Sequence, residues 1–456
     1  MKIDYVSVDE IKGADYNPRK ISDDKIDELA KSIKDLGFIL PILVNKSNNI
    51  IIAGHQRTKT ARKIGIEKVP AFFINNMSIS DEINFNQIHN GSEYKLIKPS
   101  EIKNRYEKEK YIEIEPDDLI VYKDYINMSV VNSLCLMINK YGNVFLSIAC
   151  KNKILFQNEY AYACKILNIK CNAYICTDEK FEKVKEYFSK QYGEYYYDNI
   201  KKTTFVQGLA QLNRNTDMNS NKERRRSILY EDFVFQFLKS NKIETILDFG
   251  CGKGAYINLL KKKGYKGIGV EFYNNNKKSI DVIKGNKQID ELINYLKKSN
   301  TFDLVICDSV LNSVDSMKAQ LSVMDCLNLF SKDYCFISGI TLNKAKQLNK
   351  SSANRRVTSK LRFFDKNNFT ASFRNGKWYF QKYHEKKDVY ELAEKSGFKV
   401  LEYQVVSGSF KALLIKNKQL STQRYKEAIN FEFNLPLPNN KSYNRHEDVL
   451  KVLKFI

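Results

Sequence analysis

The stretch from Thr245 to Tyr273 constrains the fold more than any other part of the chain. An apolar run, Thr245 to Asp248, ends in a carboxylate, and glycines then follow at alternate positions, namely Gly250, Gly252 and Gly254. Helix-type spacing begins after them, so the pattern predicts a strand, a tight loop and a helix. A second apolar run ends at Glu271, roughly 20 residues later, where the tip of the next parallel strand is expected. Together the two runs predict a nucleoside-binding βαβ crossover.

Glycine suits such a loop because the backbone must turn sharply and approach a ligand closely, which a Cβ would prevent. Asp248 would repel a pyrophosphate, which argues against a dinucleotide. The string DFGCGKG instead resembles the first motif of class I S-adenosylmethionine-dependent methyltransferases, whose ligand carries no phosphate. The resemblance implies that Asp248 and the three glycines hold S-adenosylmethionine and that Glu271 accepts hydrogen bonds from its ribose. The alternative is a glycine-rich turn that binds no ligand.

The string FDLVICDSVLNSV predicts a buried parallel strand at Leu304 to Cys307 that ends at Asp308, where open α/β sheets place ligands. In class I methyltransferases this strand end carries residues that face the methyl group. Asp308 and Asn312 are therefore the expected catalytic residues, which would orient an amine or a hydroxyl by hydrogen bonds. Neither the Pro-Pro-aromatic string of amino-methylating DNA enzymes nor the Pro-Cys string of cytosine-C5 enzymes is present. CDSVLNSV, with DFGCGKG and VEFY, resembles methyltransferase-like proteins associated with DNA phosphorothioation systems.

Residues 1–92 form the first expected domain. They contain NPR at Asn17 to Arg19, a helix expected after Ser22, and short strands on both sides of GHQRTKTARKIG. In this order the segments resemble the N-terminal domain of the ParB/sulfiredoxin fold, an α+β domain. The resemblance implies that an arginine-rich box holds nucleotide or DNA phosphates at the start of a helix. Here the box consists of Gly54, His55, Gln56 and Arg57, with one of its two usual arginines, and the alternative is that it caps a helix and binds nothing.

Residues 93–200 are expected to hold a linker and a degenerate second ParB-like unit. The segment Lys151 to Ile175 can be aligned with Asn49 to Phe73, which places Tyr174 on Phe72. Internal similarity of this kind is typical of a repeated unit. Asn158-Glu159-Tyr160 replaces the box, so this unit is expected to keep the packing positions and to lack the anion site. The alternative is chance similarity between two strand-helix-strand segments.

Residues 201–420 form the expected methyltransferase domain, which is Rossmann-like with a mostly parallel sheet. An insertion from Lys344 to Lys382 is rich in Lys, Arg and aromatic residues, and this combination predicts a clamp for a DNA strand with an extruded base. The expected DNA contacts are Arg355, Arg356, Lys360 and Arg362. The alternative is a β-hairpin whose aromatic side chains pack inward beneath solvated charges. Residues 421–456 are expected to form a tail that is only partly ordered.

The chain carries a formal net charge of +22 together with an ordinary hydrophobic content of 43%. Excess Lys and Arg favours a polyanionic partner, because each neutralised phosphate releases counterions, and DNA is the expected partner. Codon bias in an AT-rich genome is the alternative. The nine cysteines include no CxxC pair and are expected to be reduced core thiols, so no metal site is expected. The absence of a leader-like or membrane-spanning stretch favours a cytoplasmic protein.

The sequence thus predicts an α/β protein that joins a ParB-like N-terminal domain to a class I methyltransferase domain. The predicted function is S-adenosylmethionine-dependent methylation of DNA, with the ParB-like domain docking on DNA or binding a nucleoside triphosphate. A homodimer is also compatible with the sequence. The alternative is a non-catalytic DNA-binding regulator or partition-type protein that keeps S-adenosylmethionine as a structural or sensed ligand. The missing Pro-Pro-aromatic string keeps this alternative open.

Overall fold

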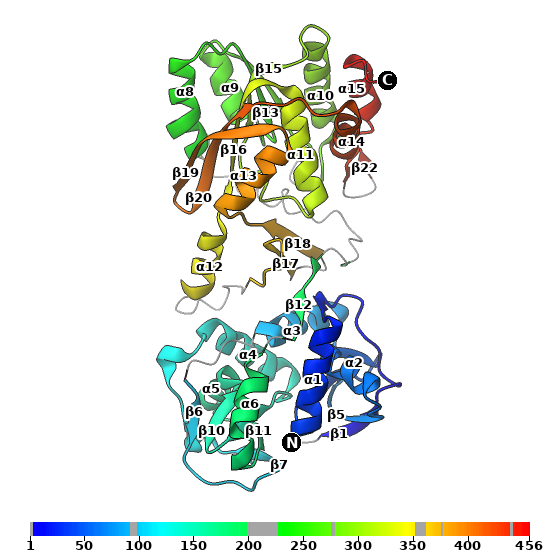
Figure 1. The fold of residues 1–456 in the computed structure, drawn as a ribbon, viewed down its shortest axis with the longest axis vertical. Coiled ribbons are helices and arrows are strands. Elements are labelled where there is room, and N and C mark those ends of the chain that lie inside the picture. Colours follow the sequence, from blue (N-terminus) through cyan, green and yellow to red (C-terminus); the bar gives the residue numbers. More distant parts are fainter. Residues whose placement is uncertain are drawn as a thin grey trace. The chain divides into compact units, whose positions relative to one another are not determined.

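The computed structural model describes residues 3–91, 98–190, 192–197, 200, 227–274, 279–351, 362–374, 377–437 and 441–456. The chain divides into two compact units with a mixed α/β architecture, as the sequence predicts (Figure 1). The N-terminal unit comprises Met1–Lys201, Leu348–Lys366 and Phe373–Gly376. The C-terminal unit comprises Lys202–Gln347, Asn367–Ser372 and Lys377–Ile456. Within the described ranges, the helices are all too short or too polar to cross a membrane.

The first sheet of the N-terminal unit has the order β1-β5-β3-β4. Its strands are β1 (Asp4–Ser7), β3 (Ile42–Asn45), β4 (Ile50–Ala53) and β5 (Lys68–Ile74). β3 and β5 run parallel, and the other neighbours pair antiparallel. The helices of this part are α1 (Asp23–Leu36), α2 (His55–Lys63) and α3 (Ile79–Gly91), and a short β2 (Arg19–Lys20) pairs with β12 (Glu194–Tyr195).

Helix α1 illustrates how local sequence sets these boundaries. Ser22 precedes the helix in an extended conformation, although its hydroxyl makes no capping hydrogen bond. Acidic residues in the first turn interact favourably with the helix dipole, and Gly37, with φ of 83°, ends the helix. The buried apolar positions are spaced by three and four residues, at Ile26, Leu29, Ile33 and Leu36. They orient α1 toward the interior of the unit.

The second sheet has the order β7-β11-β9-β10-β6-β8. Its strands are β6 (Ser100–Ile102), β7 (Lys110–Ile114), β8 (Leu119–Ile120), β9 (Ser147–Cys150), β10 (Lys153–Phe156) and β11 (Cys171–Ile175). The helices are α4 (Met128–Tyr141), α5 (Asn158–Leu167) and α6 (Phe181–Phe188), and short 3₁₀ turns lie at Pro116–Asp118, Lys123–Tyr125 and Asp178–Lys180.

The order β7-β11-β9-β10 repeats the order and the strand directions of β1-β5-β3-β4. In both sheets a helix, α2 or α5, connects the last two strands in sequence. The pairing register places Phe72 opposite Leu43 and Tyr174 opposite Ile148, in agreement with the alignment of Tyr174 on Phe72. This recurrence supports the proposed internal repeat.

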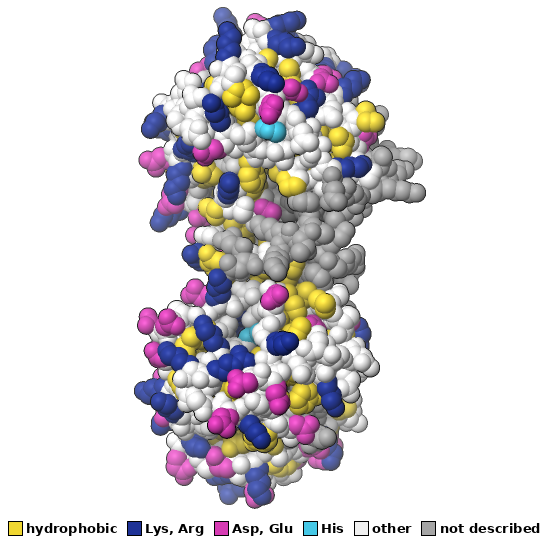
Figure 2. All heavy atoms as spheres, turned by 90° about the vertical axis from the view of Figure 1, so that its right-hand side faces the viewer, with side chains coloured by type: hydrophobic (Ala, Val, Ile, Leu, Met, Phe, Trp, Pro, Cys, Tyr) yellow, Lys and Arg dark blue, Asp and Glu magenta, His cyan; other side chains and the backbone are white. Residues whose placement is uncertain are grey.

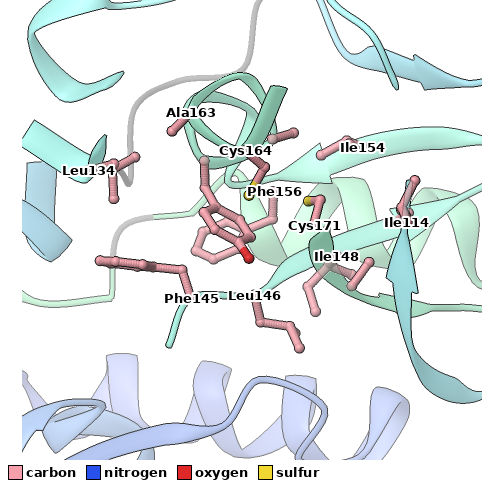
Figure 3. Close-up of a cluster of buried hydrophobic side chains, with 14 of the residues drawn as sticks. Ile114, Leu134, Phe145, Leu146, Ile148, Ile154, Phe156, Ala163, Cys164 and Cys171 are labelled. Atoms are coloured by element: carbon pink, nitrogen blue, oxygen red, sulfur yellow. The ribbon is translucent and has the colours of Figure 1, made fainter. Parts of the chain in front are cut away.

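The two sheets of the N-terminal unit share one hydrophobic core. Its second half, shown in Figure 3, contains Phe145, Ile148, Ile154 and Cys164 as buried side chains. The ring of Phe145 also stacks on Phe85 of α3, with centroids 5.1 Å apart and an interplanar angle of 6°. Because apolar area removed from water is the main stabilising contribution to folding, the two sheets of the N-terminal unit stabilise each other.

The sheet of the C-terminal unit has the order β14-β13-β15-β16-β20-β19. Its strands are β13 (Thr245–Phe249), β14 (Lys266–Val270), β15 (Phe302–Cys307), β16 (Ser331–Ile340), β19 (Phe398–Val406) and β20 (Ser409–Lys416). The first four strands in this order are parallel, and β20 and β19 form an antiparallel hairpin at the edge. This arrangement is the mostly parallel Rossmann-like sheet that the sequence predicts.

Helices cover both faces of this sheet (Figure 1). A π-helical segment, Leu229–Val234, continues into α8 (Phe235–Ser240) and packs with α9 (Ala255–Lys262) on one face. The helices α10 (Val282–Leu296) and α11 (Met317–Phe330) lie on the other face, where they contact α15 (His446–Val452) and α14 (Thr422–Glu432), respectively. The remaining elements are α12 (Leu342–Ser351), β17 (Phe369–Arg374), β18 (Lys377–Lys382), α13 (Lys386–Lys395), β21 (Pro436–Leu437) and β22 (Lys441–Ser442).

The prediction of a partly ordered C-terminal tail is wrong for the described residues after Ser421. α14 buries Tyr425, Ala428 and Ile429, and this spacing of three and four residues is that of an amphipathic helix. Phe433, which follows α14, packs edge-to-face against Phe272, with ring centroids 5.2 Å apart. The Asn-rich composition had concealed this apolar stripe.

The insertion after β16 contains the hairpin β17–β18, and three of the hairpin's aromatic side chains are buried. Phe369, Trp378 and Phe380 are each at most 6% exposed. For these residues the clamp prediction is wrong, because a buried ring cannot stack on an extruded base, and the inward-packed hairpin describes them better.

The expected DNA contacts Arg355, Arg356 and Lys360 lie outside the described residues. Arg362 is half-buried within the N-terminal unit. In the same unit Phe363 stacks on Tyr195, with centroids 5.1 Å apart, and Tyr197 donates a hydrogen bond to the Phe363 carbonyl.

We predict that Phe433→Ala lowers the free energy of unfolding of the C-terminal unit by about 3–5 kcal/mol, because it leaves a cavity beside Phe272. Gln423→Ala, on the exposed face of α14, should change it by less than about 0.5 kcal/mol. Urea unfolding followed by circular dichroism measures both. Equal stability of the two variants would mean that α14 is not part of the folded core.

Candidate cofactor and acceptor site

The carboxyl edge of the C-terminal sheet gathers the predicted site residues around one cavity. β13 is paired on one side with β14, where Asp248 lies opposite Gly269, and on the other with β15, where it lies opposite Ile306. Parallel strands end at the same edge, so the loop after β13, Glu271 after β14 and Asp308 after β15 meet there. All three line a cavity of about 1140 Å³. A volume of this order accommodates a nucleoside-sized ligand with room for a second molecule.

The glycine loop has the conformation that its sequence predicts. Gly250, Gly252 and Gly254 all have positive φ, of 91°, 58° and 81°. A Cβ on Gly250 would lie 2.3 Å from Val310 Cγ2, so this glycine permits close packing against the loop after β15. A Cβ on Gly252 would meet no heavy atom within 4 Å. The backbone at Gly252 therefore faces open space, which a ligand can occupy.

Glu271 closes the loop from the side of β14. Its carboxylate accepts hydrogen bonds from the backbone N–H groups of Gly252, at 2.9 Å, and Tyr273, at 2.8 Å. Burial raises the pKa of Glu271, although both hydrogen bonds oppose the rise. Each carboxylate oxygen has further acceptor capacity, so Glu271 can also bind hydroxyl groups.

Asp248 is the most buried carboxylate of the predicted cofactor site, at 3% exposure. Its Oδ2 atom accepts a hydrogen bond of 2.6 Å from the Tyr230 hydroxyl, and its Oδ1 atom has no hydrogen-bond partner among the described residues. Burial raises the pKa of Asp248 to about 7, and the charges of Asp308 and Glu271 add to the rise. A buried acceptor without a partner is costly, so Oδ1 marks a position for a ligand donor.

The predictions from sequence missed Ser227 and Tyr230, which lie at the start of the π-helical segment Leu229–Val234. Tyr230 stacks on Tyr256 of α9, with centroids 4.2 Å apart, and this stacking directs its hydroxyl to Asp248. The Ser227 hydroxyl donates to Asp308 at 2.5 Å. π-Helical turns often occur at functional sites, but their hydrophobic pattern does not distinguish them from an ordinary helix.

Asp308 is held by hydroxyl groups from two further residues. Ser338 of β16 donates to its Oδ1 atom, and Ser309 Oγ donates to the same atom at 3.2 Å. Ser309 itself has φ of 63°, a conformation that L residues rarely adopt and that the surrounding hydrogen bonds maintain. Asp308 is therefore rigidly placed at the cavity wall.

Asn312 also lines the cavity, but its amide is engaged by backbone groups. Its Nδ2 atom donates to the Lys382 carbonyl at 2.7 Å, and its Oδ1 atom accepts from Ile340 N at 2.7 Å. At 1% exposure this side chain joins β18 to the end of β16. We therefore assign Asn312 a positioning role and retain Asp308 as the candidate catalytic residue.

A second residue missed from sequence is Glu432, at the end of α14. It lines the cavity at 5% exposure and has no hydrogen-bond partner among the described residues. Burial, with a smaller contribution from Asp315, raises its pKa to about 8. The C-terminal segment thus supplies one wall of the cavity and a carboxyl group that is mostly neutral at pH 7. The sequence did not indicate Glu432 because residues 421–456 were predicted to form a partly ordered tail.

The predicted phosphate box of the N-terminal unit surrounds the start of α2. Gly54 has φ of 99°, and a Cβ there would lie 2.6 Å from Ile42 Cγ2. His55 accepts a hydrogen bond from Ala14 N at 3.2 Å, and Gln56 donates to the Arg19 carbonyl at 3.1 Å. Arg57 donates to the carbonyls of residues 40 and 41. Contacts within the protein thus orient the side chains of the box.

At the equivalent place in the second sheet, Gln157 precedes α5 with φ of 62°. Asn158 there accepts from Ser100 N at 2.9 Å and donates to the Lys98 carbonyl at 3.2 Å. Glu159 is 7% exposed, and burial raises its pKa. These side chains occupy the position that corresponds to the box. The described residues contain no cluster of His, Cys, Asp and Glu that could hold a metal ion.

Two family models match the chain. Residues 1–91 match the ParB N-terminal domain, and residues 221–403 match a methyltransferase domain. The chain joins a ParB N-terminal domain to a methyltransferase domain. The first match covers the sheet β1-β5-β3-β4, and the second covers most of the sheet of the C-terminal unit. Both matches agree with the families that the sequence resembles.

Two curated relatives each match a short part of the chain. A probable chromosome-partitioning protein ParB from Campylobacter jejuni is 41% identical over 70 residues, which cover 15% of this chain and 25% of that protein. A nucleoid occlusion protein from Bacillus cereus is 47% identical over 64 residues, 13% of this chain and 22% of that protein. The chain therefore spans about a quarter of the length of these relatives.

Among solved structures, the magnesium protoporphyrin IX methyltransferase (ChlM) from Synechocystis PCC 6803 with bound SAH matches with a TM-score of 0.29 and 13% identity. The match covers 46% of this chain and 94% of that one.

The cofactor of this kind of methyltransferase domain is S-adenosylmethionine, and the cavity fits it. Gly252 leaves space at the loop backbone, Glu271 can accept from ribose hydroxyls, and Asp248 presents an unpartnered oxygen to a donor. When bound, the cofactor supplies a methyl group on a positively charged sulfur. Several buried carboxyl groups around the cavity favour such a cation.

We predict that Gly252→Asp abolishes binding of S-adenosylhomocysteine, because its carboxylate would occupy the open space and lie close to Glu271. Gly264→Asp is the matched control, since Gly264 also has positive φ and an open Cβ direction but lies in the exposed turn between α9 and β14. Isothermal calorimetry measures both affinities. Equal affinity in the Gly252 variant and the wild type would refute the assignment of the loop.

The affinity for S-adenosylmethionine should rise with pH through about 7, where Asp248 ionises, because the ionised carboxylate attracts a cation. Below this midpoint the affinity should fall by up to about tenfold per pH unit. Tyr230→Phe removes the hydrogen bond that lowers the pKa of Asp248, so the midpoint should move to higher pH. Calorimetry over a range around that pKa, from about pH 5.5 to about pH 8.5, tests the pH dependence of the wild type and the shifted midpoint of the variant. An unshifted midpoint in Asp248→Asn would assign the transition to Glu271 or Glu432.

Proposed function

We propose that this protein transfers a methyl group from S-adenosylmethionine to DNA. The observation that carries the proposal is the single cavity that combines the glycine loop, Asp248 and Glu271 with the rigidly held Asp308. Methyl transfer needs an aligned nucleophile more than it needs strong acid or base groups, so positioning supplies most of the rate. The cofactor would occupy the side of Asp248 and Glu271, and the acceptor would approach Asp308.

DNA as the acceptor is supported by charge and by the attached domain. The chain carries a formal net charge of +22, which favours a polyanion. The relatives of the ParB N-terminal domain are named for chromosome partitioning and nucleoid occlusion, both of which concern DNA. On the face in Figure 2, Lys and Arg are interspersed with Asp and Glu over each unit. Attraction to DNA would then come from many dispersed contacts.

The ParB N-terminal domain would act as a docking or nucleotide-binding module. The box at the start of α2 supports an anion site because a helix N-terminus presents free N–H groups and a favourable dipole. Arg57 lies in the first turn of this helix, although carbonyl groups of the preceding loop already engage its guanidinium. A nucleoside triphosphate is the candidate ligand there, and DNA phosphate is the alternative.

The deciding experiment follows labelled methyl from S-adenosylmethionine to plasmid DNA from a host without this gene. Asp308→Ala should reduce transfer by about 100-fold or more, because loss of the oriented carboxylate misplaces the acceptor. DNA affinity should stay near that of the wild type, since Asp308 makes no attraction to phosphate. Asp333→Ala, on the exposed start of β16, is the control and should retain full activity. Label that never reaches nucleic acid would refute methylation of DNA and favour a non-catalytic regulator.

A further inference from the structure

Lys411 of β20 carries a buried amine that has no partner among the described residues. Its side chain is 5% exposed and lines the same cavity as Asp308. Among the residues that the structure describes, no hydrogen bond or ion pair engages its amine. An unpaired buried ammonium is costly, and such a group is therefore retained for a ligand or held neutral. The sequence motifs did not indicate this residue, because β20 is far from all of them along the chain.

The position of Lys411 relative to Asp308 follows from strand pairing. Lys411 lies directly opposite Ser338 across the antiparallel pair of β20 and β16. Side chains of such a pair lie on the same face of the sheet, with Cβ atoms about 5 Å apart. The Ser338 hydroxyl donates to Asp308, so Lys411 belongs to the acceptor side of the cavity.

Burial, rather than neighbouring charge, favours the neutral form of Lys411. Burial lowers the pKa of the amine, and Asp308 opposes this effect. The negative charge of Asp308 is already shared with the hydroxyls of Ser227, Ser309 and Ser338. The nearby carboxyl group of Asp248 accepts a hydrogen bond from Tyr230. These hydroxyl contacts moderate the field that would otherwise keep Lys411 protonated.

We propose that Lys411 is the general base of methyl transfer. This inference rests on the function proposed above. Its substrate would be an acceptor that carries a proton on the attacking nitrogen or oxygen, such as an amine or a hydroxyl. Asp308 orients this group, and the neutral amine of Lys411 removes its proton. Buried lysines with a depressed pKa are well suited to this role.

The step is balanced in atoms and charge. The lone pair of the acceptor forms a bond to the methyl carbon while the bond from this carbon to sulfur breaks, and its electron pair neutralises the positive sulfur. The acceptor proton moves to Lys411 Nζ, which becomes an ammonium ion and later releases the proton to water. No further reactant is required.

The first test measures the amine directly and needs no acceptor. Competitive labelling with acetic anhydride at a series of pH values, followed by peptide mass spectrometry, gives the pKa of each lysine in the full-length protein. We expect Lys411 to titrate below the ordinary lysine value of about 10.4. A Lys411 that titrates like the exposed lysines overturns the inference, whether or not DNA is methylated.

The second test follows transfer to DNA against pH. Lys411→Met should reduce kcat by about 100-fold or more and remove the limb of the profile on which the rate rises with pH. Lys411→Arg should not restore the rate, because a guanidinium keeps the positive charge and cannot accept a proton. The matched control is Lys416→Met on the same strand, whose amine donates to the carbonyls of Asn328 and Ser331. It should keep the wild-type pH profile.

Binding of S-adenosylhomocysteine, measured by calorimetry, should be equal in the wild type and in all three variants, which shows that the cavity is intact. Restoration by Lys411→Arg, or an unchanged pH profile in Lys411→Met, overturns the inference and makes Lys411 an electrostatic anchor. A wild type that binds the cofactor and transfers nothing to DNA refutes the proposed function. The labelling experiment then decides separately whether Lys411 has the proton affinity of a base.

Discussion

The parallel pairing of β13 with a strand on each side is the constraint on which the C-terminal unit depends. Because β14, β13 and β15 end at one edge, the polar residues that follow them lie close together although they are far apart in the sequence. The glycine loop can approach this edge only because Gly250 leaves room for Val310. A sheet with one of these strands reversed would distribute the same residues over two ends of the domain and would have no shared cavity.

Convergence of these strand ends has an electrostatic cost that the fold has only partly compensated. Asp248, Glu271, Asp308 and Glu432 all line one cavity, and burial raises the pKa of three of them. Backbone N–H groups stabilise Glu271, serine hydroxyls stabilise Asp308, and Tyr230 stabilises one oxygen of Asp248. What remains is a cavity with a deficit of positive charge. Such a deficit is relieved by a cationic ligand, which is how a folded domain can select a sulfonium compound over a neutral nucleoside.

The sequence predicts those parts of the site whose residues belong to contiguous sequence motifs. DFGCGKG, Glu271 and Asp308 follow apolar runs, so their places at strand ends could be inferred from local pattern. Lys411 and Ser338 become neighbours only through the antiparallel pairing of β16 and β20. Glu432 depends on the docking of α14, and Ser227 depends on a π-helical turn that periodicity does not reveal. In the ParB N-terminal domain the location of Arg57 could be inferred, but its engagement by carbonyl groups could not.

The insertion after β16 has a consequence for how such a protein can arise and change. Phe363 lies between two segments of the methyltransferase sequence, yet its ring stacks on Tyr195 of the N-terminal unit. The insertion and the rest of the N-terminal unit therefore depend on each other for this contact. A recombination event that exchanged only the first 200 or so residues for another module would leave the aromatic face of Phe363 without its partner. Shuffling of intact domains, the common route to fused proteins, is thereby restricted, and divergence of this protein should proceed by coordinated substitution at both ends of the contact.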